Sequence, residues 1–171
     1  ANTRNTPVEE VEIRSPIRVD RYELRGASPA PGRWRGGIGT VRENRFLVDT
    51  IVSCEGDRNY DAPRGILGGE DGLPGRITHL TANGEEHVIY SKFSGYRFSA
   101  GDVLRFETPM GGGYGDPYAR DPELILRDAL DGSISREEAT ERYGVALNLD
   151  RRAVDAEQTA AIRNARAPRR A

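Results

Sequence analysis

The sequence contains very little cysteine, very little lysine and no long apolar run. Its single cysteine, Cys54, excludes an internal disulfide framework and a cysteine-based zinc site, and we expect it to be a small, buried apolar residue. Lys92 is the only lysine, and the other 24 of the 25 lysine and arginine residues are arginines. No apolar stretch approaches the roughly 18 residues that a membrane span requires. The N-terminal residues lack the charged and apolar regions of a signal peptide, so a cytoplasmic protein without membrane contact is the expectation.

Common catalytic and nucleotide-binding motifs are missing as well. The sequence has no G-x-x-x-x-G-K-[ST] phosphate loop, no G-x-S-x-G serine elbow and no H-E-x-x-H zinc motif. With 171 residues and a net charge of -2, the chain fits one domain, or one domain with an appendage. The sequence therefore offers no complete catalytic constellation of its own.

Glycine is abundant and lies in clusters between patterned apolar segments, which predicts a mainly β fold with glycine-rich loops. Within residues 17–25 the apolar positions change parity, which indicates a β-bulge or two short strands. Further strands are expected within 38–52 and at 103–107, and the stretch 61–75, rich in glycine and proline, is expected to be an irregular loop. Residues 1–118 are thus predicted to form a β-rich body, either a sandwich or a barrel-like structure.

A β-hairpin is predicted where the segments 76–81 and 86–92 flank an Asn-Gly pair at 83–84, the dipeptide that suits a two-residue turn. The two histidines of the chain, His79 and His87, lie on its two strands. A two-residue turn sends their side chains to opposite faces, so we expect two separate polar or partly buried histidines. They would share a face, and so could share a metal, only if the loop held an odd number of residues.

Residues 119–171 are predicted to form a small α-helical C-terminal segment with a basic tail. The residues that mark its helix ends are Asp121 before Pro122 as an N-cap, Ser135 with Glu138 as a capping box, Gly144 as a stop, and Asp150 as the cap of a third helix. Six arginines follow residue 150, which is compatible with nucleic-acid binding. Because no aromatic residues lie among them and the whole chain is slightly acidic, we expect a solvated terminal helix and no nucleic-acid partner.

Three features are candidates for contact with a substrate or a partner. The run G-G-G-Y-G-D-P at 111–117 either cradles an anion with its amides or forms a tight structural turn. The run R-W-R-G-G at 33–37 places a tryptophan between two guanidinium groups, which suits an anion, a partner or a core plug. Asp57 and Arg58 either contact a substrate or partner or pair with each other, and Lys92 either binds an anion or is an ordinary exposed lysine. The candidate contact residues are Arg33, Trp34, Arg35, Asp57, Arg58, Lys92, Gly111, Gly112, Gly113 and Tyr114; no catalytic residue and no metal ligand is assigned.

The order of the motifs is more specific than any one of them. Four segments follow one another, namely NTRNTPVEEVE at 2–12, RYELRGASPAPGRWRGGIGTVRE at 21–43, GDRNYDAPRGILGGEDGLPG at 56–75, and GDVLRFETPMGGGYGDP at 101–117 with its continuation to 145. Together they resemble the hydantoinase B/oxoprolinase family, over residues 2–148 and over the C-terminal part of that family's large subunit. Two positions depart from the family pattern: Arg64 stands where a tryptophan is usual, and Met110 stands where a further glycine is frequent.

The resemblance implies that this chain is one part of a multi-subunit enzyme. It implies a hydantoinase A-type subunit that binds ATP and magnesium, a second polypeptide that supplies the rest of hydantoinase B, and no cofactor on this chain. Such complexes open cyclic amides such as 5-oxoproline, or carboxylate ketones such as acetone, by phosphoryl activation of an oxygen. We therefore expect a subunit or part of an ATP-dependent hydantoinase or oxoprolinase that is inactive alone. The alternatives are a subunit of a ketone carboxylase and a non-catalytic assembly module.

Overall fold

The computed structural model describes residues 5–166 and divides the chain into two compact units, each built from three stretches of sequence. The first unit takes the residues up to 25, 39–61 and 74–109, and the second takes 26–38, 62–73 and the residues from 110 on. The expected division into a β-rich body at 1–118 and a helical C-terminal segment at 119–171 stays a prediction.

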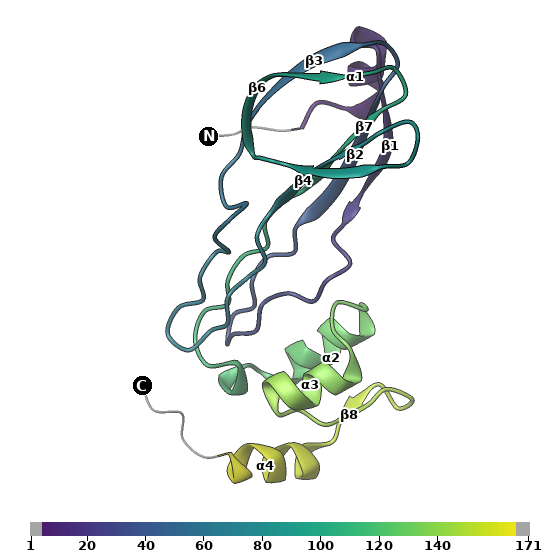
Figure 1. Cartoon of the computed structure of the whole chain (residues 1–171). Helices are drawn as coiled ribbons and strands as arrows, with labels where there is room; N and C mark the ends of the chain where they lie inside the picture. The colour runs from purple at the N-terminus through teal and green to yellow at the C-terminus, as the bar shows by residue number, and fades with distance from the viewer. Residues whose placement is uncertain (1–4, 167–171) are drawn as a thin grey trace. The chain divides into compact units, whose positions relative to one another are not determined.

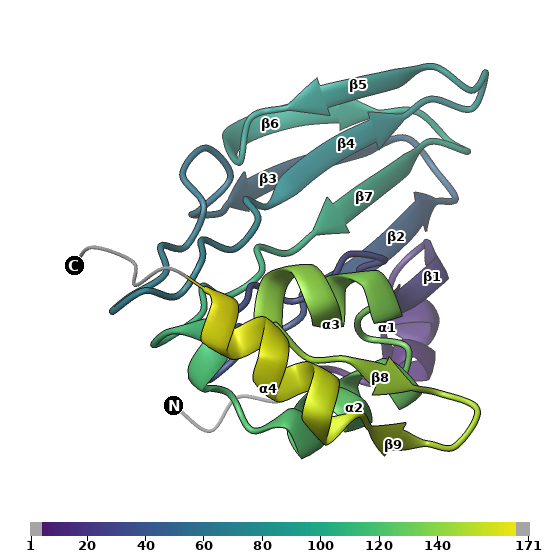
Figure 2. The same ribbon diagram turned by 90° about the horizontal axis from the view of Figure 1, so that it is seen from below.

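The first unit contains a five-stranded antiparallel sheet in the order β1-β2-β7-β4-β5, whose strands are all labelled in Figure 2 and seen from another side in Figure 1. Its strands are β1 (Ile17–Leu24), β2 (Thr40–Phe46), β7 (Val103–Glu107), β4 (Arg76–Leu80) and β5 (Glu86–Ile89). The predicted irregularity in the first strand is confirmed, since the register of β1 against β2 shifts between Val19 and Arg21. A short helix, α1 (Val8–Arg14), precedes β1; sequence analysis missed it because seven residues are too few to show a helical period.

A second, two-stranded sheet lies within the same unit. It pairs β3 (Thr50–Glu55) with β6 (Lys92–Phe98), which run side by side in Figure 1. Residues of both sheets share one apolar core, whose buried members are Phe46, Ile77, Phe98 and Leu104. The mainly β prediction is confirmed in its sandwich form, because the two sheets pack through this core and do not close into a barrel.

The hairpin between β4 and β5 corrects the predicted register. The Thr81 amide donates to the Glu85 carbonyl at 2.9 Å, so three residues form the loop, with Gly84 at a φ of +89° in its last position. A glycine in the left-handed region at that place is typical of a three-residue loop with a bulge. Asn83 and Gly84 are therefore its second and third residues, not its first and second. The prediction of opposite faces is wrong, since His79 pairs directly with His87.

The second unit holds the helical part, shown gathered together in Figure 2. Its elements are η1 (Pro117–Ala119), α2 (Pro122–Leu130), α3 (Arg136–Tyr143), β8 (Leu147–Asn148), β9 (Ala153–Val154) and α4 (Ala156–Ala165). Their buried apolar core is made of Ile125, Leu126, Ile134, Ala139, Tyr143, Val145 and Leu147. Within residues 5–166, no helix is both long and apolar enough to cross a membrane.

Most of the predicted helix ends are confirmed. The Asp121 side chain accepts the Glu123 amide, the Ser135–Glu138 capping box is complete, and Gly144 ends α3 at a φ of +65°. The prediction that Asp150 caps the third helix is wrong. A short hairpin of β8 and β9 occupies that region, and Asp155 caps α4 by accepting the Gln158 amide at 2.9 Å. The end of the arginine tail lies outside the described residues.

Candidate functional site

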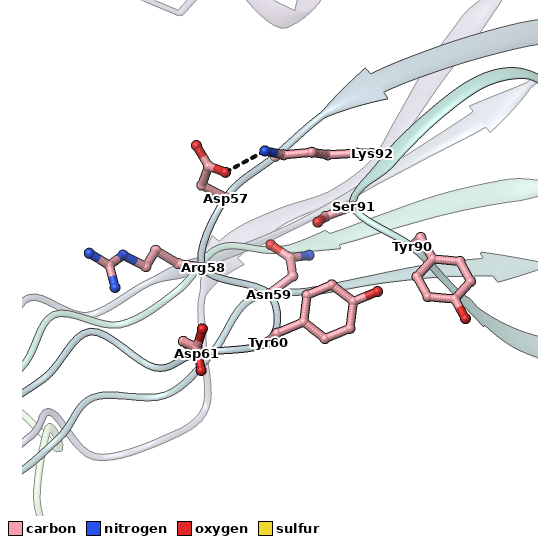
Figure 3. Close-up of a pocket in the computed structure, with 9 residues that line it drawn as sticks. Asp57, Arg58, Asn59, Tyr60, Asp61, Tyr90, Ser91 and Lys92 are labelled. Atoms are coloured by element: carbon pink, nitrogen blue, oxygen red, sulfur yellow. Dashed lines mark ion pairs between the residues drawn. The ribbon is translucent and has the colours of Figure 1, made fainter.

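The strand pair β3–β6 builds a pocket at its open end. Glu55, the last residue of β3, lies opposite Lys92, the first of β6, so the residues that follow β3 lie beside those that precede β6. The Gly56 amide donates to the Ser91 carbonyl at 2.8 Å and extends this contact. The pocket has a volume of about 610 Å³ and is lined by residues 56–61 and 90–92 (Figure 3).

An exposed ion pair marks one side of this pocket. Lys92 Nζ lies 2.9 Å from Asp57 Oδ1, and Figure 3 shows the two side chains pointing toward each other. Their hydrogen bond and mutual attraction lower the pKa of Asp57 and raise the pKa of Lys92. Both groups are therefore charged at neutral pH. The structure thus pairs Asp57 with Lys92, and the sequence had suggested Arg58 as its partner.

Arg58 adopts a costly backbone conformation in the same loop. Its φ of +62° lies in the left-handed region, which residues with a side chain seldom adopt. The Gly75 amide, which donates to the Arg58 carbonyl at 2.8 Å, helps to hold it there. Figure 3 shows its side chain extending away from the two tyrosine rings of the pocket.

Two tyrosines that sequence analysis missed form the other side of the pocket. Tyr60 and Tyr90 are 70% and 74% exposed, and their ring centroids lie 6.2 Å apart. Thirty residues separate them in the sequence, and only the pairing of β3 with β6 brings them together. The result is an open site with two rings and charges of both signs, suited to contact with a polar, partly planar group.

The remaining candidates lie in the second unit, where three glycine-rich segments pair through their backbones. These segments are 30–37, 63–72 and 110–115. The amides of Gly111, Gly113, Tyr114 and Gly115 all donate to backbone carbonyls at 2.8–3.0 Å. They are thus engaged within the chain and do not fit the phosphate cradle that the sequence allowed.

The arginines around Trp34 differ in their surroundings. Arg35 Nε lies 3.1 Å from Asp128 Oδ1, and the buried Asp128 also pairs with Arg120, at 2.8 Å between Oδ2 and Nη2. Arg35 thereby contributes to the packing of this unit. Arg33 is exposed, and its guanidinium lies 6.0 Å from the centroid of the Trp34 ring.

His79 belongs to a buried hydrogen-bond network within the first unit. Its Nε2 lies 2.8 Å from Asp102 Oδ2 and its Nδ1 lies 3.1 Å from Tyr96 Oη. A neutral imidazole that donates to the carboxylate accepts the tyrosine hydroxyl at its other nitrogen, so neither nitrogen remains for a metal. Among residues 5–166, no three His, Cys, Asp or Glu side chains form a group that could hold a metal ion. Partial burial raises the pKa of Cys54, which does not favour a nucleophilic thiolate.

Comparisons with known proteins agree on one family. A family model described as hydantoinase B/oxoprolinase matches residues 1–117. A Pseudomonas sp. protein, named as the B component of a D-/L-hydantoinase, is 43% identical over 95% of this chain. The crystal structure of an ATP-dependent caprolactamase from Pseudomonas jessenii has a TM-score of 0.69 at 28% identity over 94% of this chain. A nucleotide-free acetone carboxylase shares the fold, with a TM-score of 0.64 at 20% identity over 93% of this chain.

The chain is much shorter than these proteins. It spans 28% of the Pseudomonas sp. hydantoinase component, 28% of the caprolactamase chain and 26% of the acetone carboxylase chain. The family match nevertheless covers well over half of the chain itself, including the pocket and the three glycine-rich segments. The chain belongs to the hydantoinase B/oxoprolinase family.

Proposed function

We propose that this chain is part of a hydantoinase B-type polypeptide in an ATP-dependent, multi-subunit enzyme that opens a cyclic amide. The extent of the match to the Pseudomonas sp. hydantoinase component is the observation that supports this most. Nearly the whole chain aligns with it, yet the chain spans 28% of its length. In this proposal the rest of the hydantoinase B sequence and a hydantoinase A-type subunit complete the enzyme.

ATP and magnesium are proposed to bind the hydantoinase A-type subunit. Four amides of its glycine-rich run, those of Gly111, Gly113, Tyr114 and Gly115, donate to backbone carbonyls and are not free to cradle a phosphate, which supports placing the nucleotide on the partner. Bound to the partner, ATP would supply phosphoryl activation of the amide carbonyl. This chain's own share would be to hold the substrate or the partner.

The pocket of residues 56–61 and 90–92 is the proposed contact of this chain with the substrate or the partner. Its Asp57–Lys92 pair is exposed and thus accessible to a polar group, and its two tyrosine rings offer an apolar surface beside that pair. A cyclic amide combines the same two characters, since a planar polar bond is part of an apolar ring.

We propose a cyclic amide as the substrate, and not a ketone, because of the sequence identities to the two solved structures. The caprolactamase is 28% identical to this chain, whereas the acetone carboxylase is 20% identical and supports the fold alone. To test this, the chain is co-expressed with a hydantoinase A-type subunit and the remainder of a hydantoinase B polypeptide. We expect ATP-dependent opening of lactams or hydantoins that disappears when this chain is omitted. Turnover by the isolated chain, or carboxylation of acetone with bicarbonate and no ring opening, would contradict the proposal.

A substitution at Lys92 tests whether this chain takes part in the reaction or serves only in the assembly of the complex. The variant Lys92→Met removes the ion pair with Asp57, and we expect about a tenfold fall in kcat/KM with the complex still assembled. Arg97→Met is the matched control, because Arg97 is an exposed cation on the same strand outside the pocket. Unchanged kinetics in both variants would favour the non-catalytic assembly module.

A further inference from the structure

Four large apolar side chains are exposed together on the three glycine-rich segments. Trp34, Ile66, Leu67 and Tyr114 are 57%, 57%, 71% and 49% exposed. Trp34 forms an antiparallel bridge with Tyr114, and Ile66 forms a parallel bridge with the same tyrosine. Because bridge partners present their side chains to the same face, Trp34, Tyr114 and Ile66 stand in a row, with Leu67 next to Ile66. We call these four residues the apolar row.

The backbone beneath the apolar row is firmly held. Trp34 and Tyr114 exchange two amide-to-carbonyl hydrogen bonds of 2.9 Å, and the Ile66 amide donates to the Gly113 carbonyl at 2.9 Å. A surface that is ordered before it meets a partner loses little conformational entropy on binding. The row is therefore suited to docking.

Leu67 is strained where it stands. Its φ is +51° and that of Gly68 is +92°, so both central residues of the turn closed by the Gly69 amide and the Ile66 carbonyl lie in the left-handed region. Leucine is disfavoured there, and this side chain gains little contact in return because it is mostly exposed. A partner that buried Leu67 would recover part of that cost.

We propose that the apolar row packs against the remaining part of the hydantoinase B polypeptide; this rests on the proposed function. In the Pseudomonas sp. hydantoinase component and in the caprolactamase, the region equivalent to this chain belongs to a polypeptide more than three times as long. All four residues lie within the 117 residues that the family model matches, so they belong to the shared part of the fold. Tryptophan, tyrosine and a neighbouring arginine, here Arg33, are the side chains that most often anchor protein interfaces.

The test uses a chimera in which this chain replaces the matching segment of the Pseudomonas sp. hydantoinase component. Trp34 is the only tryptophan of this chain, and in a 5-fluorotryptophan-labelled sample its fluorine resonance is assigned with Trp34→Phe. In the isolated chain the resonance should shift between H2O and D2O, because the ring is exposed. In the chimera that solvent shift should disappear. A solvent shift retained in the chimera would overturn the proposal.

Leu67→Gly supplies a second measurement. In the isolated chain, glycine relieves the left-handed strain and should raise the Tm by a few degrees. In the chimera the same change removes a buried contact and should lower the Tm. Val88→Asp is the control for an exposed apolar side chain elsewhere, and it should act equally in both settings. An equal effect of Leu67→Gly in both settings would count against the proposal.

Two further measurements cover an insoluble chimera and the binding of a second copy of this chain at the apolar row. If the chimera is insoluble, the labelled chain is titrated with the Pseudomonas sp. hydantoinase component from which the matching segment has been deleted. Ile66→Asp should weaken that binding about tenfold or more, and unchanged affinity would overturn the proposal. Self-association of the isolated chain that Ile66→Asp abolishes would assign the row to a second copy instead. None of these measurements uses turnover, so a complex that docks through the row but opens no cyclic amide would overturn only the proposed function.

Discussion

Asp102 connects three neighbouring segments of the first unit through one buried carboxylate. It accepts the amides of Ala82 and Ser99, each at 2.9 Å, and lies 2.8 Å from His79 Nε2. Burial alone would raise the pKa of this carboxyl group. The two amides and the histidine outweigh it, so the pKa lies below its ordinary value of 3.8.

This lowered pKa predicts how Asp102→Asn changes stability with pH. A carboxylate with a lower pKa in the folded state stabilises the fold above the unfolded-state pKa, and this stabilisation is lost as the pH falls through the folded-state pKa. We expect the variant to lose about 1–3 kcal/mol of unfolding free energy at pH 7, because the hydrogen bonds to a charged acceptor weaken. The difference from the unsubstituted chain should shrink below pH 4. Denaturant titrations at pH 7 and pH 3 measure it, with the exposed Asp150→Asn as the control; a difference independent of pH would contradict the assignment.

At the scale of elements, the glycine-rich segments depend on backbones that approach closely. A Cβ on Gly113 would overlap the Pro31 carbonyl oxygen, whereas a Cβ on Gly37 would meet nothing within 4 Å. We therefore predict that Gly113→Ala lowers the unfolding free energy by about 3 kcal/mol or more, since neither backbone can give way easily. Gly37→Ala, in the neighbouring segment, should change it by no more than about 0.5 kcal/mol. Thermal unfolding followed by circular dichroism compares the two, and equal losses would show that the close approach does not matter.

The elements also show which features a sequence can predict. The ends of α2 and α3 were predictable because Asp121, Ser135 and Gly144 act on amides and carbonyls within four residues of themselves. The register of the β4–β5 hairpin was not, because an Asn-Gly pair fits a two-residue loop and the end of a three-residue loop alike. The difference of one residue in the length of this loop decides whether His79 and His87 lie on the same face of the sheet.

The candidate site was predictable in its charges but not in its shape. Asp57, Arg58 and Lys92 stood out as isolated charges, and the structure places all three at one pocket. The tyrosines beside them gave no signal, since their proximity comes from a strand pairing that joins residues more than thirty positions apart. The backbone contacts of the glycine run were hidden for the same reason. Its partners lie in two segments distant in the sequence. A glycine indicates that another part of the backbone can approach closely, but it does not indicate which segment approaches.

For the whole molecule, the question is how far the helical segment depends on the rest of the second unit. Its apolar core lies entirely between residues 125 and 154. Several ion pairs nevertheless reach it from other segments, among them Arg35 to Asp128 and Glu70 to Arg142, the latter at 2.8 Å. The core argues for independent folding, and the ion pairs argue that such a fold would be less stable.

We predict that residues 119–171 expressed alone fold cooperatively, with a lower Tm than the same helices have in the full chain. The core supplies the cooperativity, while the loss of Arg35 leaves the buried Asp128 with one cationic partner fewer. Circular dichroism on heating measures the transition in both proteins. Asp128→Asn should narrow the difference, because it removes the charge that the missing arginine neutralised. A helical signal that fades without a transition would instead show that segments 26–38 and 62–73 are required for this unit to fold.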